Sequence, residues 1–123
     1  MTDEERELLR AAREVRIETS RGEGAPVHRT IIWVVVDDAD RVLVRTYLGP
    51  GSRWYREALA SGRVRLVSGE RAIDFSVEAA TDPDRMEACS DALRAKYRRS
   101  VSLDAMLRDE VLGTTLELHP HQD

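Results

Sequence analysis

The sequence is poor in the residue types that build disulfides and metal sites. Its 123 residues include one cysteine, one lysine and three histidines. The single cysteine, Cys89, excludes an internal disulfide and a metal site made from a cysteine cluster. The histidines are few, and His119 and His121 lie next to the C-terminus, so no metal site is predicted. Lys96 is the only lysine, so every other basic side chain, histidine aside, is an arginine.

The sequence also lacks long apolar segments and an excess of positive charge. No run approaches the roughly 20 apolar residues that cross a bilayer. The polar, acidic start Met-Thr-Asp-Glu-Glu-Arg is unlike a signal peptide. We therefore expect a cytoplasmic protein that does not bind membranes. The net charge of −4 argues against nucleic-acid binding, which needs a basic surface.

The residues that are present suit one globular domain spanning residues 1–123. Apolar residues make up 41% and charged residues 34%, which is ordinary for such a domain. Apolar patterns predict about six strands, and helical spacing with capping residues predicts three or four helices. The strands are expected at 15–19, 27–36, 42–48, 64–67, 72–79 and 111–118. The helices are expected at 3–13, after Ser52, from 81–84 to Tyr97, and at 102–108.

The order of these elements indicates the fold class. Short loops join most of the strands, which is typical of antiparallel pairs and of a small barrel rather than a doubly wound sheet. We predict an α+β split β-barrel of about six mainly antiparallel strands with flanking helices. Residues Ile31–Val36 are apolar on both faces, so we expect the barrel interior on one side. A helix or a partner subunit is expected on the other.

The stretch Val42–Val67 organises this arrangement. It reads as a strand, a glycine-rich turn, a short helix and a second strand. Ser52 is placed to cap the helix and Gly62 to end it. Arg45 near the end of the strand and Arg53 in the first helical turn flank a helix N-terminus. The backbone amides and positive dipole end of the helix, together with the two guanidinium groups, are suited to bind a phosphate there.

Each of these residues also has an ordinary structural interpretation. Arg45 interrupts an apolar strand, so it needs a ligand, water or an acidic partner. Capping alone accounts for Ser52, and Trp54 and Tyr55 serve either as packing anchors or as contacts to a ring. Tyr97 lies on the apolar stripe of its helix, either packed in the core or with its hydroxyl in a substrate pocket.

Two further residues are expected to be structural only. Cys89 shares the helix face of Tyr97 and is expected to be a small buried side chain. His28 is expected at the surface.

Four segments follow one another in a recognisable order and spacing. They are Arg29–Val35, Val42–Tyr47, Gly49–Leu59 and Val64–Leu66. Together they resemble the FMN-binding split-barrel superfamily. They are most similar to the branch that holds the deazaflavin-dependent nitroreductases and a related uncharacterised bacterial domain family. The similarity covers roughly residues 18–79.

The resemblance implies a homodimer with two cofactor sites at its interface. Each site would bind FMN or a deazaflavin coenzyme and transfer a hydride to a small organic acceptor. Because the cofactor supplies the reactive atom, no catalytic triad is expected and no catalytic residue is assigned. The residues that match the phosphate side are Arg45, Thr46, Ser52, Arg53 and Trp54. Those that match the strand beneath the ring system are Arg29, Thr30 and Ile31.

Two departures from that branch keep a second interpretation open. The loop before Arg29 has Arg21 as its only cation and includes Glu23, where the branch carries several basic residues. Ala58 stands where the branch usually carries an asparagine. The alternative is therefore a catalytically inactive cofactor-binding protein, or a dimeric structural protein, of the same fold.

Overall fold

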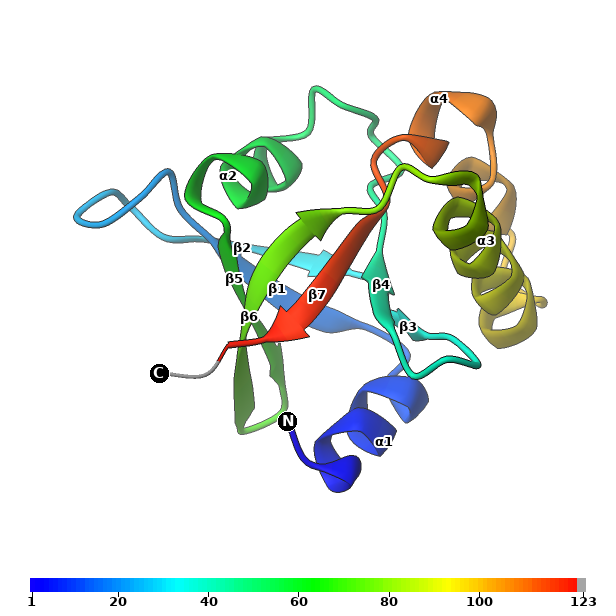
Figure 1. Ribbon diagram of the computed structural model, residues 1–123, viewed down its shortest axis with the longest axis horizontal. Coiled ribbons are helices and arrows are strands. Elements are labelled where there is room, and N and C mark those ends of the chain that lie inside the picture. Colours follow the sequence, from blue (N-terminus) through cyan, green and yellow to red (C-terminus); the bar gives the residue numbers. More distant parts are fainter. Residues whose placement is uncertain (122–123) are drawn as a thin grey trace.

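The computed structural model describes residues 1–121 as one curled antiparallel sheet with helices around it (Figure 1). The sheet order is β2-β1-β5-β6-β7-β4-β3, and every pair is antiparallel. The strands are β1 Val15–Thr19, β2 His28–Ile32, β3 Val35–Val36, β4 Val42–Val44, β5 Arg63–Ser68, β6 Arg71–Ala79 and β7 Leu116–Pro120. The helices are α1 Asp3–Ala11, α2 Arg53–Ser61, α3 Pro83–Tyr97, the 3-10 turn η1 Leu103–Met106 and α4 Asp109–Leu112. The predicted α+β split barrel is thus confirmed, with seven strands in place of about six.

The extra strand arises because the long apolar run bends at Trp33 and Val34. The Trp33 ring stacks on Tyr97 with centroids 3.8 Å apart. The Val34 carbonyl accepts a hydrogen bond from Lys96 Nζ at 2.7 Å. At the bend, side chains of α3 therefore replace a neighbouring strand as the contacts of the chain. Strands β2 and β3, on either side of the bend, form the two opposite edges of the sheet. Since these edges are joined by only two residues, the sheet has to curl into an open barrel.

Helix α2 has the boundaries that its local sequence predicts. It spans Arg53–Ser61 and ends at Gly62, whose φ of 73° is a left-handed conformation that glycine adopts without strain. Trp54 and Ala58 are buried in the barrel core, against residues such as Phe75. Ser52 occupies the N-cap position, but its hydroxyl makes no capping hydrogen bond.

A second core covers the outer side of β3 and β4. Val35, Leu43, Cys89, Leu93 and Met106 are buried together there, which confirms the buried placement of Cys89. The covering of Val35 that was expected from a helix or a partner therefore comes from α3 and η1 of the same chain. Within the predicted apolar run Ile31–Val36, Ile31 is not covered, because 61% of its surface is exposed to solvent.

The structure corrects the sequence-based expectation near the C-terminus. Val111 and Leu112 belong to α4 rather than to the last strand, because the Thr114 and Thr115 hydroxyls donate to their carbonyls at 2.6 and 2.7 Å. Those bonds hold a turn, and β7 begins only at Leu116. His119 and Pro120 lie in β7, not in a polar tail. Residues 122–123 of the expected tail lie outside the described residues.

Two other elements are shorter than expected: β4 stops at Val44, and the helix expected at 102–108 is reduced to the 3-10 turn η1, with α4 following as a separate short helix. No helix within residues 1–121 is long and apolar enough to cross a membrane.

Lys96 ties three elements together and offers a direct test of the fold. Its Nζ donates to the carbonyls of Leu9 and Val34 at 3.0 and 2.7 Å. Burial lowers the pKa of this ammonium from 10.5 to about 8.

Because Lys96 is the only lysine, a ¹³C NMR titration of lysine-labelled protein measures the pKa of this one side chain. The unfolded chain keeps the proton up to about pH 10.5, so stability is expected to rise between pH 8 and 10.5. A midpoint near 10.5 in the folded protein would contradict the buried placement.

Candidate functional site

A pocket of about 520 Å³ lies between α2 and the loop that joins β1 to β2. In Figure 1, α2 (green) and this loop (blue) project from the same side of the sheet. The helix contributes residues spaced three or four apart, which share one helix face. The lining residues are Arg21, Pro26, His28, Arg53, Arg56, Glu57 and Ala60.

Three of the lining residues are arginines that form no ion pair, although the charge of Arg53 helps to lower the pKa of Glu57. Arg21, Arg53 and Arg56 are exposed, and none forms an ion pair or side-chain hydrogen bond within residues 1–121. Several other arginines of the chain form ion pairs, such as Arg29 with Glu18 at 2.7 Å. Unpaired guanidinium groups around a concave surface are suited to an anion, because each offers a fork of N–H donors.

The pocket also holds a buried carboxylate that fixes a histidine. Glu57 is 5% exposed. It accepts a hydrogen bond from the Thr19 hydroxyl at 2.9 Å and contacts His28 Nδ1 at 2.9 and 3.1 Å. Burial raises the pKa of Glu57, but the hydrogen bonds from Thr19 and His28, with the charges of His28 and Arg53, outweigh it and leave this pKa below its ordinary value. An ionised carboxylate only accepts, so Nδ1 carries the hydrogen and Nε2 is left for a ligand.

This pair and two of the arginines were not found from the sequence. His28 was expected at the surface, yet it is half-buried. Thr19 and His28 are paired across β1 and β2, which places both beneath α2. The signal available in the sequence was the polar helix face of Arg53, Arg56 and Glu57, opposite Trp54. That face does not reveal which strand residue it meets.

Arg45 occupies a place that differs from the predicted phosphate site. It is 1% exposed. Its Nη1 donates to Ser90 Oγ at 3.0 Å and to the Met106 carbonyl at 2.9 Å. Nε donates to Thr115 Oγ1 at 3.0 Å, and Nη2 to the Met86 carbonyl at 2.9 Å. These contacts correct both interpretations drawn from the sequence, because four internal oxygens, none of them acidic, take the place of a ligand or an ion pair.

Burial lowers the pKa of the Arg45 guanidinium, although arginine stays cationic at neutral pH. We therefore assign Arg45 a structural role, joining α3, η1 and Thr115, the residue before β7, to the end of β4.

The other predicted phosphate residues separate into two groups. Arg53 lines the pocket, and Ser52 directly precedes it. Ser52 Oγ is buried and is the one buried side-chain oxygen within residues 1–121 without a hydrogen-bond partner. Thr46 is buried in the turn after β4, where its Oγ1 accepts from the Leu48 amide at 3.2 Å. Trp54 is a packing anchor in the barrel core.

The residues predicted beneath a ring system lie on the edge strand β2. Arg29 and Ile31 are exposed, and Thr30 is half-buried. The Tyr97 hydroxyl does not point freely into a substrate pocket, as one interpretation of the sequence had it. Its side chain is 4% exposed, and its hydroxyl donates to the Arg13 carbonyl at 2.7 Å. Core packing is therefore the role of Tyr97 that the structure shows.

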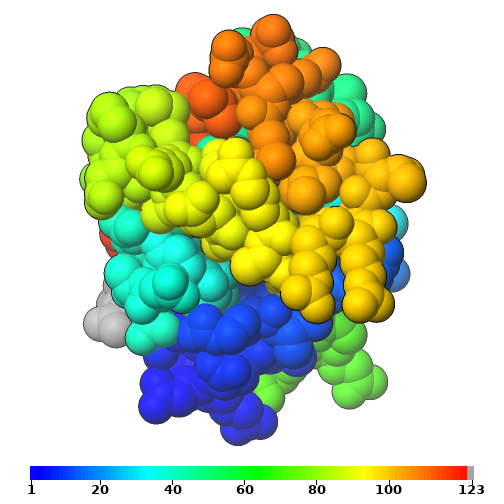
Figure 2. All heavy atoms as spheres, turned by 90° about the vertical axis from the view of Figure 1, so that its right-hand side faces the viewer, coloured from blue at the N-terminus to red at the C-terminus, as the bar shows by residue number. Residues whose placement is uncertain are grey.

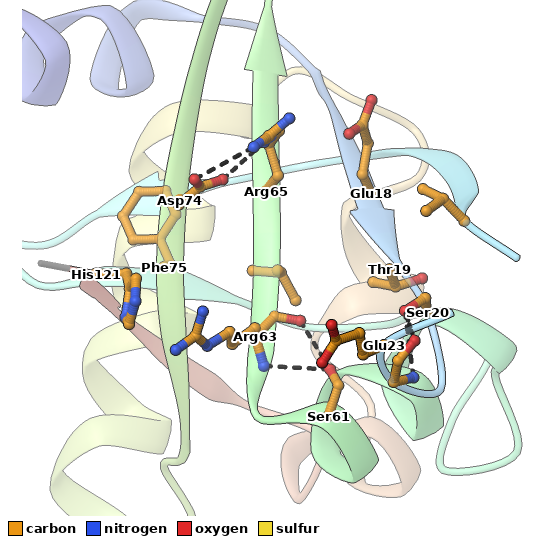
Figure 3. Close-up of a pocket in the computed structure, with 13 residues that line it drawn as sticks. Glu18, Thr19, Ser20, Glu23, Ser61, Arg63, Arg65, Asp74, Phe75 and His121 are labelled. Carbon is orange, nitrogen blue, oxygen red and sulfur yellow. Dashed lines mark hydrogen bonds and ion pairs between the residues drawn. The ribbon is translucent and has the colours of Figure 1, made fainter. Parts of the chain in front are cut away.

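A larger cavity of about 790 Å³ adjoins the β1–β2 loop on strands β1, β5 and β6 (Figure 3). Its charges are mixed: Glu18, Glu23 and Asp74 face Arg63 and Arg65. Arg65 and Asp74 neutralise each other through two hydrogen bonds of 2.7 and 3.3 Å, drawn in Figure 3. The cavity therefore lacks the excess positive charge of the pocket beside α2.

One cluster has the spacing of metal ligands, formed by Glu78, Glu117 and His119. Arg85 Nη1 lies between the two carboxylates and bonds them at 2.8 and 2.9 Å. These hydrogen bonds, with those to Asp82, raise the pKa of Arg85. A guanidinium thus holds the position that a cation would take.

With this geometry described, comparison with known proteins identifies the family. Residues 5–118 match the profile of a family described as uncharacterized proteins conserved in bacteria, DUF2255. The chain belongs to the DUF2255 family. No curated protein matches this DUF2255 sequence.

Solved structures share the split-barrel fold of this DUF2255 chain, which is the fold that the sequence resemblance predicted. A conserved hypothetical protein, Rv2991 of Mycobacterium tuberculosis, is 16% identical, with a TM-score of 0.71 over 99% of this chain and 82% of that one. An F420-H2 dependent reductase is 12% identical, with a TM-score of 0.62 over 87% and 94%. An FAD-binding protein of Mesorhizobium loti is 16% identical, with a TM-score of 0.61 over 99% and 91%. The fold is thus one that cofactor-binding proteins share.

Proposed function

We propose that the protein binds a phosphorylated flavin or deazaflavin and acts as an oxidoreductase on a small organic acceptor. The observation that carries this proposal is the convergence of Arg21, Arg53 and Arg56, none of which forms an ion pair within residues 1–121, on one pocket. The flavin and F420 named for two similar structures support the cofactor class. When bound, such a cofactor supplies the atom that accepts or gives the hydride.

The residues of the pocket fit the phosphate of such a cofactor. The guanidinium groups of Arg53 and Arg56 project from α2 and that of Arg21 from the facing loop, so they approach an anion from two sides. Glu57 holds His28 Nδ1 and leaves Nε2 as a further contact. The Ser52 hydroxyl at the start of α2 has no hydrogen-bond partner and could donate to the phosphate, at a helix end that favours negative charge.

We extend the proposal to a homodimer. Strand β2 is an edge of the sheet, and the exposed Ile31 side chain stands on it. An unpaired edge with an apolar side chain is readily covered by a second copy of the chain. The ring of the cofactor would then lie near Arg29, Thr30 and Ile31, at the interface.

The second candidate is a protein that binds the cofactor without turnover. Two features favour it: Glu23 brings negative charge to the β1–β2 loop, and Ala58 is fully buried where the deazaflavin branch carries an asparagine. Steady-state reduction of a nitroaromatic or a quinone by the loaded protein would eliminate this candidate. A bound cofactor that no donor reduces would favour it.

Arg53→Ser and Arg56→Ser are each expected to weaken FMN or deazaflavin binding by about 1–3 kcal/mol, the scale of a lost charge-assisted hydrogen bond. This corresponds to roughly a 5- to 150-fold increase in Kd. The measurement is a fluorescence titration of each cofactor into the wild type and the variants. Arg94→Ser, an exposed α3 residue paired only with Asp91, is the matched control and should bind like the wild type. Wild-type affinity in both pocket variants would refute the phosphate assignment.

A further inference from the structure

A second positively charged pocket, of about 520 Å³, lies at the C-terminal end of α3. Four of its seven lining residues are cations and none is acidic, although the chain as a whole carries a net charge of −4. The lining residues are Arg13, Ala95, Lys96, Tyr97, Arg98, Arg99 and Ser100. Nothing in the proposed oxidoreductase function uses this pocket.

Hydrogen bonds between distant segments hold the pocket together. The Tyr97 hydroxyl donates to the Arg13 carbonyl, and Lys96 Nζ donates to the Leu9 carbonyl at the end of α1. The connection after α1 is thereby fixed against the last turn of α3. Figure 2 shows the same arrangement from outside, with the yellow α3 segment lying directly on the blue N-terminal segment. Arg13 is therefore brought beside Arg98 and Arg99, which lie 85 and 86 residues further along the chain (98 − 13 and 99 − 13).

The arginines of this pocket are not held in ion pairs within the described part of the chain, and the nearby acid Glu14 acts on the Tyr97 hydroxyl, whose pKa is raised by burial and, less strongly, by Glu14. Arg13, Arg98 and Arg99 form no ion pair there, whereas Arg94, one turn earlier, pairs with Asp91 at 3.0 Å. The Lys96 hydrogen bonds go to carbonyls only. The dipole of α3 favours cations at its end. It does not account for Arg13, which belongs to another element.

We propose that this pocket binds a compact phosphate-type anion with at least two negative charges, such as a diphosphate group. The volume lies within the range of small-molecule sites. Arg13 on one side and Arg98 and Arg99 on the other can donate to different oxygens of a tetrahedral group, which a planar carboxylate does not offer. The proposal is independent of the flavin site, because the two pockets share no residue.

The test is equilibrium dialysis of the full chain against inorganic pyrophosphate, with Arg98→Ser/Arg99→Ser as the test variant and Arg94→Ser, an exposed α3 arginine outside both pockets, as the matched control. The wild type and the control should bind pyrophosphate at the α3 pocket, and the test variant should lose at least tenfold in affinity there. All three substituted residues are exposed, so folding should be unaffected. Equal binding by the test variant and the wild type would overturn the proposal, as would citrate binding as tightly as pyrophosphate.

A second readout comes from Lys96. A bound anion stabilises the charged ammonium, so saturating pyrophosphate should raise the pKa of Lys96 in the NMR titration. The same shift should appear in Arg94→Ser. An unchanged Lys96 pKa at saturation would place the pyrophosphate elsewhere and overturn the assignment to this pocket.

Discussion

Replacing Arg45 with alanine is expected to lower the free energy of unfolding by roughly 3–4 kcal/mol, the scale for breaking a buried hydrogen-bond network. The guanidinium donates to four oxygens, from α3, from η1 and from Thr115 just before β7, and Arg45 is 1% exposed. Its removal leaves those buried acceptors without donors and opens a cavity beneath Met106. Urea denaturation followed by circular dichroism measures the change.

Two controls separate this role from a ligand-binding role. Arg63→Ala removes an exposed, unpaired arginine and should change stability by less than about 0.5 kcal/mol. Arg45→Lys keeps the charge but offers donors from one nitrogen only, so it should recover part of the loss. If Arg45→Ala kept wild-type stability but lost cofactor affinity, the residue would be a phosphate ligand after all.

Replacing Glu57 with alanine is expected to lower the free energy of unfolding by about 1–3 kcal/mol at pH 7, the scale for leaving buried donors unsatisfied. The Thr19 hydroxyl and His28 Nδ1 both lose their acceptor. The matched control is Glu23→Ala, an exposed acid of the neighbouring loop, which should leave stability nearly unchanged. A loss no larger than that of the control would show that the Thr19–Glu57–His28 contact contributes little.

The same variant should alter how stability depends on pH. The folded-state pKa of Glu57 lies below the ordinary 4.5, so near that pH the unfolded chain binds more protons than the folded one. The stabilisation is therefore complete above about pH 4.5 and is lost as the pH falls through the folded-state pKa. Urea midpoints of the wild type should approach those of Glu57→Ala as the solution is acidified. A constant difference between the two proteins down to pH 2.5 would contradict this linkage.

Much of the architecture follows from local sequence signals. Gly62 ends α2 because glycine tolerates a positive φ, and Asp82 and Pro83 start α3 for equally local reasons. Apolar spacing identified Cys89 as a core residue. The sheet was predicted as antiparallel because short loops admit no other pairing.

The sequence by itself therefore determined the split barrel, most of its elements and the position of Arg53 in the first turn of α2. The tertiary structure alone decided what each charged residue meets. The partners of Arg45 lie 41 to 70 residues further along the chain, and Glu57 is 29 residues from His28. Backbone preferences and capping act over a few residues, so they can be read in order along the chain. The partner of a buried charge depends on which distant segments the packed core brings together, and no local pattern specifies that.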